Sequence, residues 1–406
     1  MGVMNHDYVN NKEAPKYAVV CARETLPTRI EKSIFLAGPT PRDPGTKSWR
    51  PEALVLLQEL GFDGHVFVPE DRNGGFHGDY THQVQWETDA LNMADVIVFW
   101  VPREMGTMPA LTTNIEWGKW ADSGKAILGA PDWAVSMRYL KWQANEYKVP
   151  LYVDLKTTLA RAVEELGPGS FREGGASRVP LLVWRHQTFQ DWYRAQIGVG
   201  NRLDGARVLW TFRVGPERKR VFCWAVHVDV YVAAEGRNKS NEFVLGRVDV
   251  AAVVLYYRGR HMMKETDAQV VLVREFRSPA RTSDGYVVEL PAGGVDPNIS
   301  PKDTAIKELK EETGFTLNEN RLRLVGTHQV AGTLSAHTAV VYAAEIEDDE
   351  LDDIESRLHE VHGVEEDTER TTVILDTLRN LYNGDNYDVD WATLGMISSA
   401  ILSHRG

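Results

Sequence analysis

The chain has 406 residues, of which 43% are hydrophobic and 25% are charged, and its formal net charge is −13. This length favours two domains over one core, and the composition is typical of a globular protein. The negative charge argues against non-specific nucleic-acid binding, which needs a basic surface.

Residues 1–31 are expected to form a polar lead-in to a first domain at 32–198. The lead-in lacks the apolar segment of a signal peptide, and no later run is long enough to span a membrane. The two cysteines lie far apart in the sequence, so neither a disulfide framework nor a zinc cluster is expected. These features predict a cytoplasmic protein that does not bind membranes.

Between residues 32 and 198, short apolar runs alternate with helical patterns. The predicted strands are "SIFLAGP", "HVFVPE", "DVIVFWVP" and "KAILGAP". The predicted helices are "RPEALVLLQELG", "THQVQWETDALNMA", "TTNIEWGKWADSGK", "MRYLKWQANEYK" and "TTLARAVEELG". Strands that alternate with helices indicate an α/β domain with a doubly wound, flavodoxin-like parallel sheet.

A Gly-rich polar stretch, "IGVGNRLDGARV", marks the predicted boundary, so the second domain is placed at 199–406. Its long β-branched runs have few helices between them, which predicts an antiparallel or mixed sheet. The acidic stretch "EDDELDDIE" is expected to be a solvated loop or helix face. Two amphipathic helices are predicted near the C-terminus, in "TERTTVILDTLRNLYNG" and "DWATLGMISSAILS".

One helix of the second domain is predicted at 301–313, with clear signals at both ends. Ser300 can cap it, Pro301 suits its first turn, and Asp303 holds the acidic position of a capping box. Gly314 supplies the C-terminal stop.

This helix carries Glu308, Glu311 and Glu312 on one face, because residues three and four apart lie on the same side. Like charges at this spacing destabilise an isolated helix, so we expect something to offset them. A divalent cation would do so, since Mg²⁺ prefers carboxylate oxygens. On spacing alone, a solvated acidic face balanced by Lys307 and Lys310 is an equal alternative.

The sequence context of this helix resembles the Nudix box. Gly293 opens the pattern, and "KELKEETGF" closes it at the family distance. The preceding "ELPAG" and "VLVREFRSPA" are similar to the ADP-ribose pyrophosphatase branch of that family. The resemblance covers roughly residues 205–400 and implies an α/β/α domain with a mixed sheet.

Two positions depart from the family pattern: Ile299 replaces a Glu, and Lys307 replaces an Arg. In the family, that Arg orients the metal-binding glutamates. Lys supplies the charge but not the planar, bidentate fork. The departures therefore leave open a weaker enzyme, an altered substrate or a site that only binds.

The resemblance also implies the roles of particular residues. Mg²⁺ or Mn²⁺ would be held by Glu308, by Glu311 as a catalytic residue, by Glu312 and by the Ala292 carbonyl. The positions that match nucleotide contacts are Arg274, Arg277 and Glu289, which are equally explained as strand-end charges. The general base is not assigned, and the available acids are Glu350, Glu365 and Glu366.

The first domain has three further features, each with an ordinary explanation when taken alone. "FLAGPTPR" is a strand followed by a Gly-Pro-Thr turn, which can present N–H groups to a phosphate or be a plain loop. "WETDALNMADVIVFWVP" is an acidic helix that leads into a buried strand. Glu116 begins a helical stretch, where an acid often serves only the helix dipole.

Together these features resemble the nucleoside 2-deoxyribosyltransferase family and its nucleotide N-glycosidase relatives, over about 32–195. Phe35 to Gly38 match an aromatic-x-x-Gly loop, with Phe35 where relatives often have Tyr. Glu87 matches an acid eight residues before Asp95, and Glu116 matches a Glu-x-Gly nucleophile.

This second resemblance implies a covalent mechanism at the anomeric carbon, with Glu116 as nucleophile. Glu87 would bind or protonate the departing base, and Asp95 would be structural or contact the sugar. The loop residues expected at the substrate are Phe35, Gly38, Thr40 and Arg42. Trp86, Trp117 and Trp120 flank these positions and could stack on a base or pack in the core.

Both resemblances point to small-molecule nucleotides, and we therefore expect a two-domain nucleotide-processing hydrolase. The domains could degrade NAD in succession, or salvage unusual nucleotides. A contrasting hypothesis is a Nudix-like sensor that binds ADP-ribose without cutting it and regulates the first domain. A homodimer is also possible.

Overall fold

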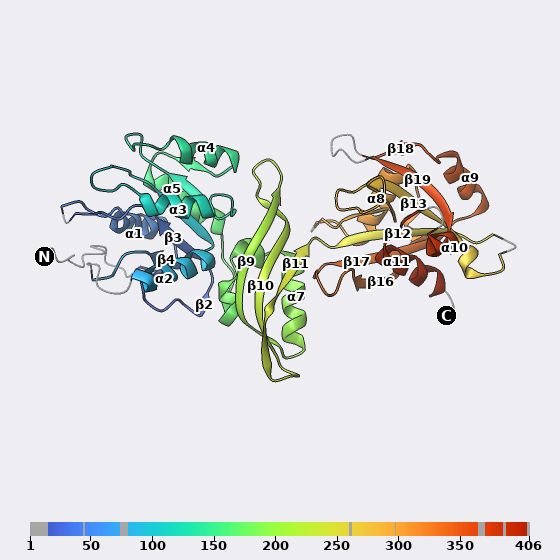
Figure 1. The fold of residues 1–406 in the computed structure, drawn as a ribbon, viewed down its shortest axis with the longest axis horizontal. Helices are drawn as coiled ribbons and strands as arrows, with labels where there is room; N and C mark the ends of the chain where they lie inside the picture. Colours follow the sequence, from blue (N-terminus) through green and yellow to red (C-terminus); the bar gives the residue numbers. More distant parts are fainter. Residues whose placement is uncertain are drawn as a thin grey trace. The chain divides into compact units, whose positions relative to one another are not determined.

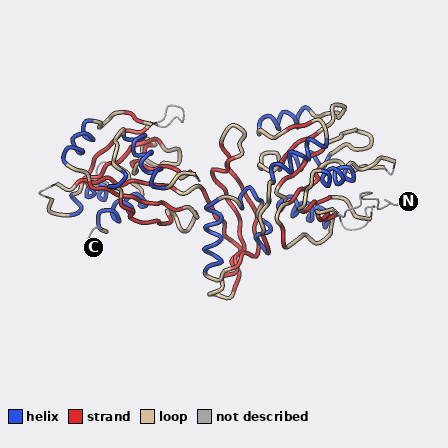
Figure 2. The backbone as a smooth tube through the Cα atoms, turned by 180° about the vertical axis from the view of Figure 1, so that it is seen from behind, coloured by secondary structure: helices blue, strands red, loops and turns tan. Residues whose placement is uncertain are grey.

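The structure is a computed structural model that describes residues 15–43, 45–73, 80–259, 262–296, 298–363, 370–384 and 387–403. The chain divides into two compact units, Met1–Leu245 and Gly246–Gly406 (Figures 1 and 2). Each unit has its own main sheet covered by helices, which confirms the predicted α/β class. None of the helices in the described ranges is long and apolar enough to cross a membrane.

The first unit is built on a six-stranded parallel sheet with the order β1-β4-β3-β5-β6-β7. Its strands are β1 (Ala18–Cys21), β3 (Ser33–Ala37), β4 (His65–Val68), β5 (Val96–Trp100), β6 (Ala126–Gly129) and β7 (Leu151–Tyr152). From β3 the chain proceeds to β4 on one side, while β5 lies on the other. Ligands of such sheets bind at the carboxyl ends of the strands at this switch point.

Helices cover both faces of this sheet because successive strand residues point to opposite sides. Phe35 and Phe99 share one buried cluster with Trp86 and Trp117, and the Phe99 and Trp117 rings are 5.1 Å apart. On the opposite face, α5 packs against β5 and β6. The helices are α1 (Arg50–Glu59), α2 (Tyr80–Met93), α3 (Leu111–Trp120), α4 (Arg138–Glu146) and α5 (Leu155–Leu166).

A three-stranded antiparallel sheet completes the first unit. Its strands are β9 (Arg202–Val214), β10 (Arg220–Val232) and β11 (Arg237–Arg247). Buried Trp224 of β10 lies 5.3 Å from the ring of Phe189 in α7 (Gln187–Gly198), beside α6 (Leu181–Trp184). A Cβ on Gly175 of η1 (Gly174–Arg178) would lie 2.4 Å from the Leu203 carbonyl oxygen. This sheet therefore packs closely on the helices α6, α7 and η1 of the same unit.

The expected domain limits and these compact units differ in two places. The expected lead-in at 1–31 includes β1, which pairs with β4 in the main sheet, and β2 (Arg29–Ile30), which pairs with β8 (Arg172–Glu173). The expected boundary at 198/199 falls between α7 and β9, whereas the first compact unit extends to Leu245. The Gly-rich stretch is followed at once by a strand that belongs to the packed sheet.

The second unit contains an eight-stranded mixed sheet in which only β12 and β17 pair in parallel among the described strands. The strands are β12 (Val250–Tyr257), β13 (Gln269–Phe276), β14 (Tyr286–Glu289), β15 (Ala292–Gly294), β16 (Arg323–Gln329), β17 (Thr338–Glu345), β18 (Val361–His362) and β19 (Thr371–Thr377). Leu309 of α8 (Pro301–Thr313) packs in the core on one face, and Ile397 of α11 (Trp391–Leu402) packs in the core on the other. Figure 1 shows α8 and α11 on opposite sides of the sheet. The predicted helix–sheet–helix arrangement is confirmed.

One of the two C-terminal helix predictions is wrong. In "TERTTVILDTLRNLYNG", Thr371–Thr377 form β19 between β13 and β18, and the helix α10 is only Leu378–Asn383. The run Thr-Thr-Val-Ile is β-branched, which favours a strand. Val373 and Ile374 lie in the two different cores, one on each face of the sheet. The other predicted helix is α11, and the acidic stretch forms α9 (Asp348–Ser356).

Candidate functional sites

The loop after β3 lies at the switch point of the first sheet and approaches β5 closely. Gly38 has a φ of +150°, and a Cβ there would lie 2.1 Å from the Trp100 carbonyl oxygen. Only glycine fits this conformation and this distance. Further along, the Arg42 N–H donates to the Thr107 carbonyl at 3.0 Å. The loop thus joins the segments that follow β3 and β5.

Arg50, at the start of α1, holds this loop from within the protein and is 1% exposed. Its guanidinium donates to the carbonyls of Leu36 at 3.1 Å and Gly38 at 2.7 Å, and to the Thr40 hydroxyl at 3.2 Å. It also pairs at 2.6 Å with Glu70, which follows β4.

The sequence reasoning missed Arg50, although a signal was present. Arg50 occupies the first position of a helical stripe whose other buried members are Ala53, Leu54 and Leu57. A charged residue at a core position is buried only when it has partners. Such a residue at the end of a parallel sheet therefore marks a region where polar groups converge.

The carboxyls of Glu116 on α3 and Glu87 on α2 are brought close enough to influence one another. Burial raises the pKa of Glu116 to about 8, the Glu87 charge adds to this rise, and the Arg50 charge opposes it. Burial also raises the pKa of Glu87, against a 2.8 Å hydrogen bond from the Gln83 amide. Neighbouring buried carboxyls resist simultaneous ionisation, so the pair retains a proton near neutral pH.

Asp95 lies away from this pair, directly before β5 at the amino end of the sheet. Its buried carboxylate makes two 2.7 Å bonds to the Arg172 guanidinium. It also accepts hydrogen bonds from the Ser33 hydroxyl at 3.0 Å and the Leu181 N–H at 2.7 Å. Of its two expected roles, structural residue or sugar contact, this geometry supports the structural one.

The aromatic and basic residues that were expected near the substrate differ in their exposure to solvent. Phe35 is fully buried, 6.4 Å from the ring of Trp86, so it packs in the core and offers no surface to a substrate. Trp117 is also a core residue, and its indole N–H donates to the Gln143 side chain at 2.9 Å. Arg42 is exposed.

In the second unit, α8 has the predicted bounds and the predicted caps. The Ser300 hydroxyl accepts the Asp303 N–H at 3.1 Å, and Gly314 adopts a left-handed conformation with φ of +68°. A Cβ at Gly314 would lie 2.8 Å from the His362 ring, so the absence of a side chain also allows β18 to approach the end of α8.

Two of the three α8 glutamates turn toward β15. A Cβ on Gly293 would lie 2.2 Å from the Glu308 carboxyl carbon, so the absence of a side chain makes room for Glu308. Glu312 is 4% exposed and accepts the Ala292 N–H at 3.1 Å. The sequence expectation placed the Ala292 carbonyl near the metal, whereas the structure shows an Ala292 contact through its N–H.

Glu312 is surrounded by other acids. Burial raises the pKa of Glu312 to about 9, and the charges of Glu308, Glu289 and Glu275 add to this rise, against the hydrogen bond from Ala292. The described residues contain no group of three or more His, Cys, Asp or Glu side chains already arranged around a metal position. Converging carboxylates are nevertheless the donor set that Mg²⁺ or Mn²⁺ needs, and a cation would offset their repulsion.

Lys307 takes part in this acidic group. Its ammonium lies 2.9 Å from the Glu311 carboxylate and 3.7 Å from Glu308. The single positive charge thus reaches two of the three glutamates. Ile299, the other departure from the family pattern, lies exposed before α8.

Of the residues that match nucleotide contacts, Arg277 and Glu289 lie together, whereas Arg274 lies on the opposite face of β13, because it pairs with Val288 and the neighbouring Val273 pairs with Glu289. Arg277 donates to Glu289 at 2.8 Å and pairs with Glu275 at 2.8 Å. Arg274 stacks over the Tyr286 ring at 3.9 Å from its centroid and pairs with Asp284 at 2.5 Å. A nucleotide beside Arg277 would therefore meet a cation that already has acidic partners.

A polar cluster that sequence reasoning missed lies at the starts of β12 and β17. The Ser335 hydroxyl is 2.5 Å from His337 Nδ1, and burial lowers the pKa of His337. Asp249 accepts the Thr338 N–H at 2.8 Å through its carboxylate and the Val295 N–H at 2.8 Å through its carbonyl. Asp249 therefore connects the cluster to Val295, the residue that follows β15.

The three acids considered for the general base have different outcomes. Glu350 pairs with Arg321 and accepts the Glu347 N–H at 2.9 Å, which occupies it at the start of α9. Glu365 and Glu366 lie outside the described residues.

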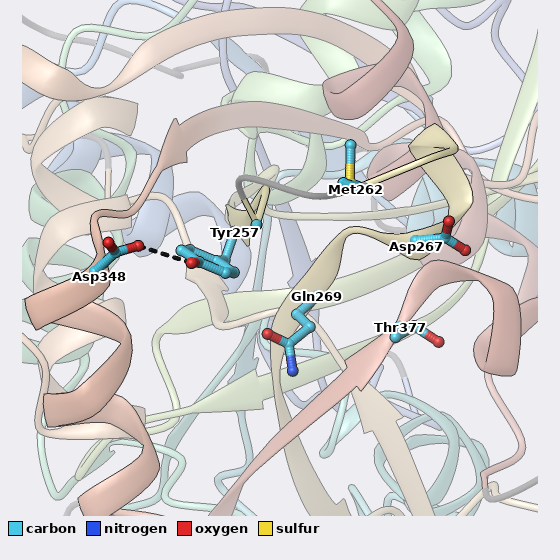
Figure 3. A pocket seen from close by; sticks show the side chains of 7 residues that line it. Tyr257, Met262, Asp267, Gln269, Asp348 and Thr377 are labelled. Atoms are coloured by element: carbon cyan, nitrogen blue, oxygen red, sulfur yellow. Dashed lines mark hydrogen bonds between the residues drawn. The ribbon is translucent and has the colours of Figure 1, made fainter.

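A separate cavity of about 520 Å³ opens at the far end of β12 (Figure 3). Tyr257, Gln269 and Thr377 pair in one row across β12, β13 and β19, and the Tyr257 hydroxyl donates to Asp348 at 2.7 Å. Tyr257 is the last residue of β12, whereas Gly293 pairs near its start, so the cavity lies away from the α8 glutamates. The lining residues are Tyr257, Gly259, Met262, Asp267, Gln269, Asp348 and Thr377.

Two protein-family models match the chain, one within each compact unit. Residues 31–133 match the family model "Nucleoside 2-deoxyribosyltransferase like", and residues 248–372 match the NUDIX domain model. Both resemblances expected from the sequence are confirmed. The NUDIX match supports a hydrolase of nucleoside-diphosphate-linked compounds, and the other match supports a nucleoside-processing role.

One curated relative is the ADP-ribose pyrophosphatase of Bacillus subtilis (strain 168). It is 29% identical over 100 residues, which is 24% of this chain. The chain spans about half of that relative's length, 49%.

Proposed function

We propose that the chain is a two-domain nucleotide-processing hydrolase. The second unit would cleave a nucleoside diphosphate linked to another moiety, as in ADP-ribose, and the first would cleave or transfer an N-glycosidic bond. The observation that carries the proposal is the convergence of half-buried Glu308 on Gly293 and of buried Glu312 on Ala292, within the segment that matches the NUDIX model.

In the second unit, Glu308, Glu311 and Glu312 would hold Mg²⁺ or Mn²⁺. When bound, the ion polarises the phosphates and makes a water more acidic. Glu311 would exchange its contact with Lys307 for the metal. Arg277 would orient the nucleotide after leaving its acidic partners, whereas Arg274 lies on the opposite face of β13.

In the first unit, the Glu116 carboxylate would attack the anomeric carbon. A C–O bond forms as the N-glycosidic bond breaks, and the departing base takes the proton held by Glu87. Water then adds at the anomeric carbon, breaks the bond to Glu116 and returns a proton to Glu87. Arg50 favours the ionised Glu116 that attack requires, whereas burial favours the protonated form.

Two joint reactions suit this pair of sites. In one, the first unit releases nicotinamide from NAD, and the second cleaves the resulting ADP-ribose to AMP and ribose 5-phosphate. In the other, the second unit cuts a diphosphate link, and the first strips the base from the monophosphate. Both orders use each site once, and their products differ.

A second candidate function is a sensor, in which the second unit binds ADP-ribose without cutting it. The observation that favours it is Lys307, whose single ammonium replaces a planar fork beside Glu311 and Glu308. The buried Glu312 argues against the sensor. Its carboxylate is repelled by the neighbouring acids Glu308, Glu289 and Glu275, and a protein that only binds ADP-ribose has no need of such a cluster.

Product analysis separates these functions. The protein would be incubated with Mg²⁺ and NAD, ADP-ribose, nucleoside triphosphates or deoxynucleoside monophosphates, and the products resolved by chromatography. AMP from ADP-ribose that is lost in Glu312→Gln but kept in the exposed-site control Glu355→Gln supports the diphosphatase. Free base that is lost in Glu116→Gln but kept in Glu146→Gln supports the glycosidase. ADP-ribose binding without turnover supports the sensor.

A further inference from the structure

Arg50 is one of several buried cations in the first unit, and its contacts go beyond those that a loop tether requires. Taking an arginine out of water is costly unless hydrogen bonds and a counter-charge compensate. The Arg50 guanidinium bonds to Leu36, Gly38 and Thr40 and pairs with one carboxylate, Glu70. A loop tether alone would need the hydrogen bonds but not the charge.

The position of that charge is what distinguishes it. Glu70 follows β4 and Arg50 begins α1, and the two pair at the carboxyl edge of the sheet. Glu87 of α2 is held at the same edge, because the Gln83 amide donates both to its carboxylate at 2.8 Å and to the carbonyl of the residue before Glu70 at 3.4 Å. Among the charged groups of the described residues that act on Glu116, Glu87 and Arg50 are the principal two, and they act in opposite directions.

Arg50 is also unsuited to direct contact with a substrate. Its Nε and both terminal nitrogens donate to protein acceptors, and its side chain is 1% exposed. It can therefore act on a bound nucleotide only through the loop that it holds and through the carboxyls that it faces.

We propose that Arg50 is a positioning residue of the first unit, which fixes the β3 loop and places one buried positive charge beside the Glu116–Glu87 pair. The role rests on the proposed glycosidic function of this unit. Because Glu70 neutralises part of the Arg50 charge, it limits how strongly that charge favours the ionised form of Glu116.

Substitutions can separate the positive charge of Arg50 from the hydrogen bonds of its planar guanidinium. Glu70→Gln removes the partner carboxylate and keeps the guanidinium with its carbonyl contacts, so the positive charge acts more strongly on Glu116. Arg50→Lys keeps the charge but loses the planar fork that reaches Leu36 and Gly38 together. Arg50→Gln removes both.

The test is a carbon-13 NMR titration of the carboxyl groups in the full chain labelled at glutamate, with Glu116 assigned by Glu116→Gln. We expect the Glu116 midpoint to move down by roughly one pH unit in Glu70→Gln and up in Arg50→Gln. Arg50→Lys should leave the midpoint nearly unchanged. Unchanged midpoints in Glu70→Gln and Arg50→Gln would overturn the proposal.

Glu24→Gln is the matched control, because Glu24 pairs with Arg72 at 2.6 Å elsewhere in the same unit. It should leave the Glu116 titration where it is in the parent protein, and an equal shift there would also overturn the proposal. Circular dichroism checks the folding of each variant. If Arg50→Gln does not fold, Glu70→Gln and Arg50→Lys still decide the question.

The titration does not depend on turnover, so it stands apart from the proposed function. If the parent protein releases no base from any nucleotide while Glu116 shifts as expected, the glycosidase assignment fails and the role of Arg50 holds. If base is released, the pH at which the rate rises should follow the Glu116 midpoint in Glu70→Gln. A rise that ignores that midpoint contradicts the proposal.

Discussion

In the first unit the two acids that meet, Glu87 and Glu116, stand on separate helices, α2 and α3. In the second unit, Glu308, Glu311 and Glu312 stand on one helix, α8. The first arrangement exists only when the parallel sheet brings two helices together. The second is already present in a single helical turn, and the sheet has only to supply Gly293 beneath it.

The counter-charges differ in the same way. Arg50 lies buried at the edge of the first sheet, and its contacts come from β3, the loop after it and the segment after β4. Lys307 lies on α8 itself, four residues before Glu311 and largely exposed. Removing a buried charge disturbs a whole region, whereas changing an exposed lysine affects only its immediate neighbours.

The largest expected effect is that of Glu312→Gln on diphosphate hydrolysis. Loss of a metal-holding carboxylate removes several kcal/mol of stabilisation, so hydrolysis of ADP-ribose should fall by about 10³-fold or more. The rate is followed by AMP release. Base release by the first unit should be unchanged, and a parallel loss of both activities would mean that the variant has lost its fold.

Glu116→Gln should have the opposite selectivity and abolish the activity of the first unit alone. Loss of the nucleophile is expected to lower base release by about 10²–10⁴-fold, while AMP production from ADP-ribose stays intact. Chromatography of both products in one reaction measures this split. Full base release by the variant would remove Glu116 from the mechanism.

Gly293→Ala should damage the second site through its shape rather than its charge. The new Cβ would lie 2.2 Å from the Glu308 carboxyl carbon, which is the end of a flexible side chain, so Glu308 should turn away from β15. We therefore expect weaker hydrolysis with a loss of less than about 1 kcal/mol in the free energy of unfolding. Gly395→Ala in α11 is the control, because no atom lies within 4 Å of its new Cβ. AMP release and denaturant unfolding are compared in the two variants, and unchanged hydrolysis in Gly293→Ala would contradict the close contact.

These contrasts explain how far the sequence predicts the molecule. The spacing of Glu308, Glu311 and Glu312 and the caps Ser300 and Gly314 are local signals, and α8 has the predicted ends. The alternation of strands and helices likewise predicts the parallel sheet of the first unit.

Other features depend on distant residues and escaped prediction. Thr371–Thr377 resembles a helix by apolar spacing, but pairing with β13 makes it a strand. Asp95 binds Arg172 across a sequence separation that no local pattern reveals. Arg50 could have been noticed as a charge on an apolar stripe, but its partners become evident only once β3 and β4 are placed side by side.

The pH dependence of the first unit should show the buried pair directly. Glu116 must be ionised to attack while Glu87 keeps the proton that it donates, and burial raises the pKa of Glu116 to about 8. Base release should therefore still be rising above pH 6 and should fall again at higher pH, once Glu87 has also lost its proton. The raised pKa means that the folded state binds the extra proton, so Glu116 contributes less to stability as pH rises from about 4.5 toward 8. Initial rates across this range test the first statement. A rate that levels off below pH 6 would show an unperturbed carboxylate.

The smallest expected effect is that of Lys307→Arg. Arginine restores a planar fork that can reach Glu308 and Glu311 together, where the lysine ammonium lies at 3.7 and 2.9 Å. Because the site is partly exposed, we expect a gain of a few tenths to about 1 kcal/mol, or less than about tenfold in ADP-ribose hydrolysis. Lys310→Arg, on the same helix, controls for the added guanidinium. A gain in Lys307→Arg alone would show that the orientation of the glutamates limits the second unit. An equal rate in both variants would show that the single charge of Lys307 already orients them.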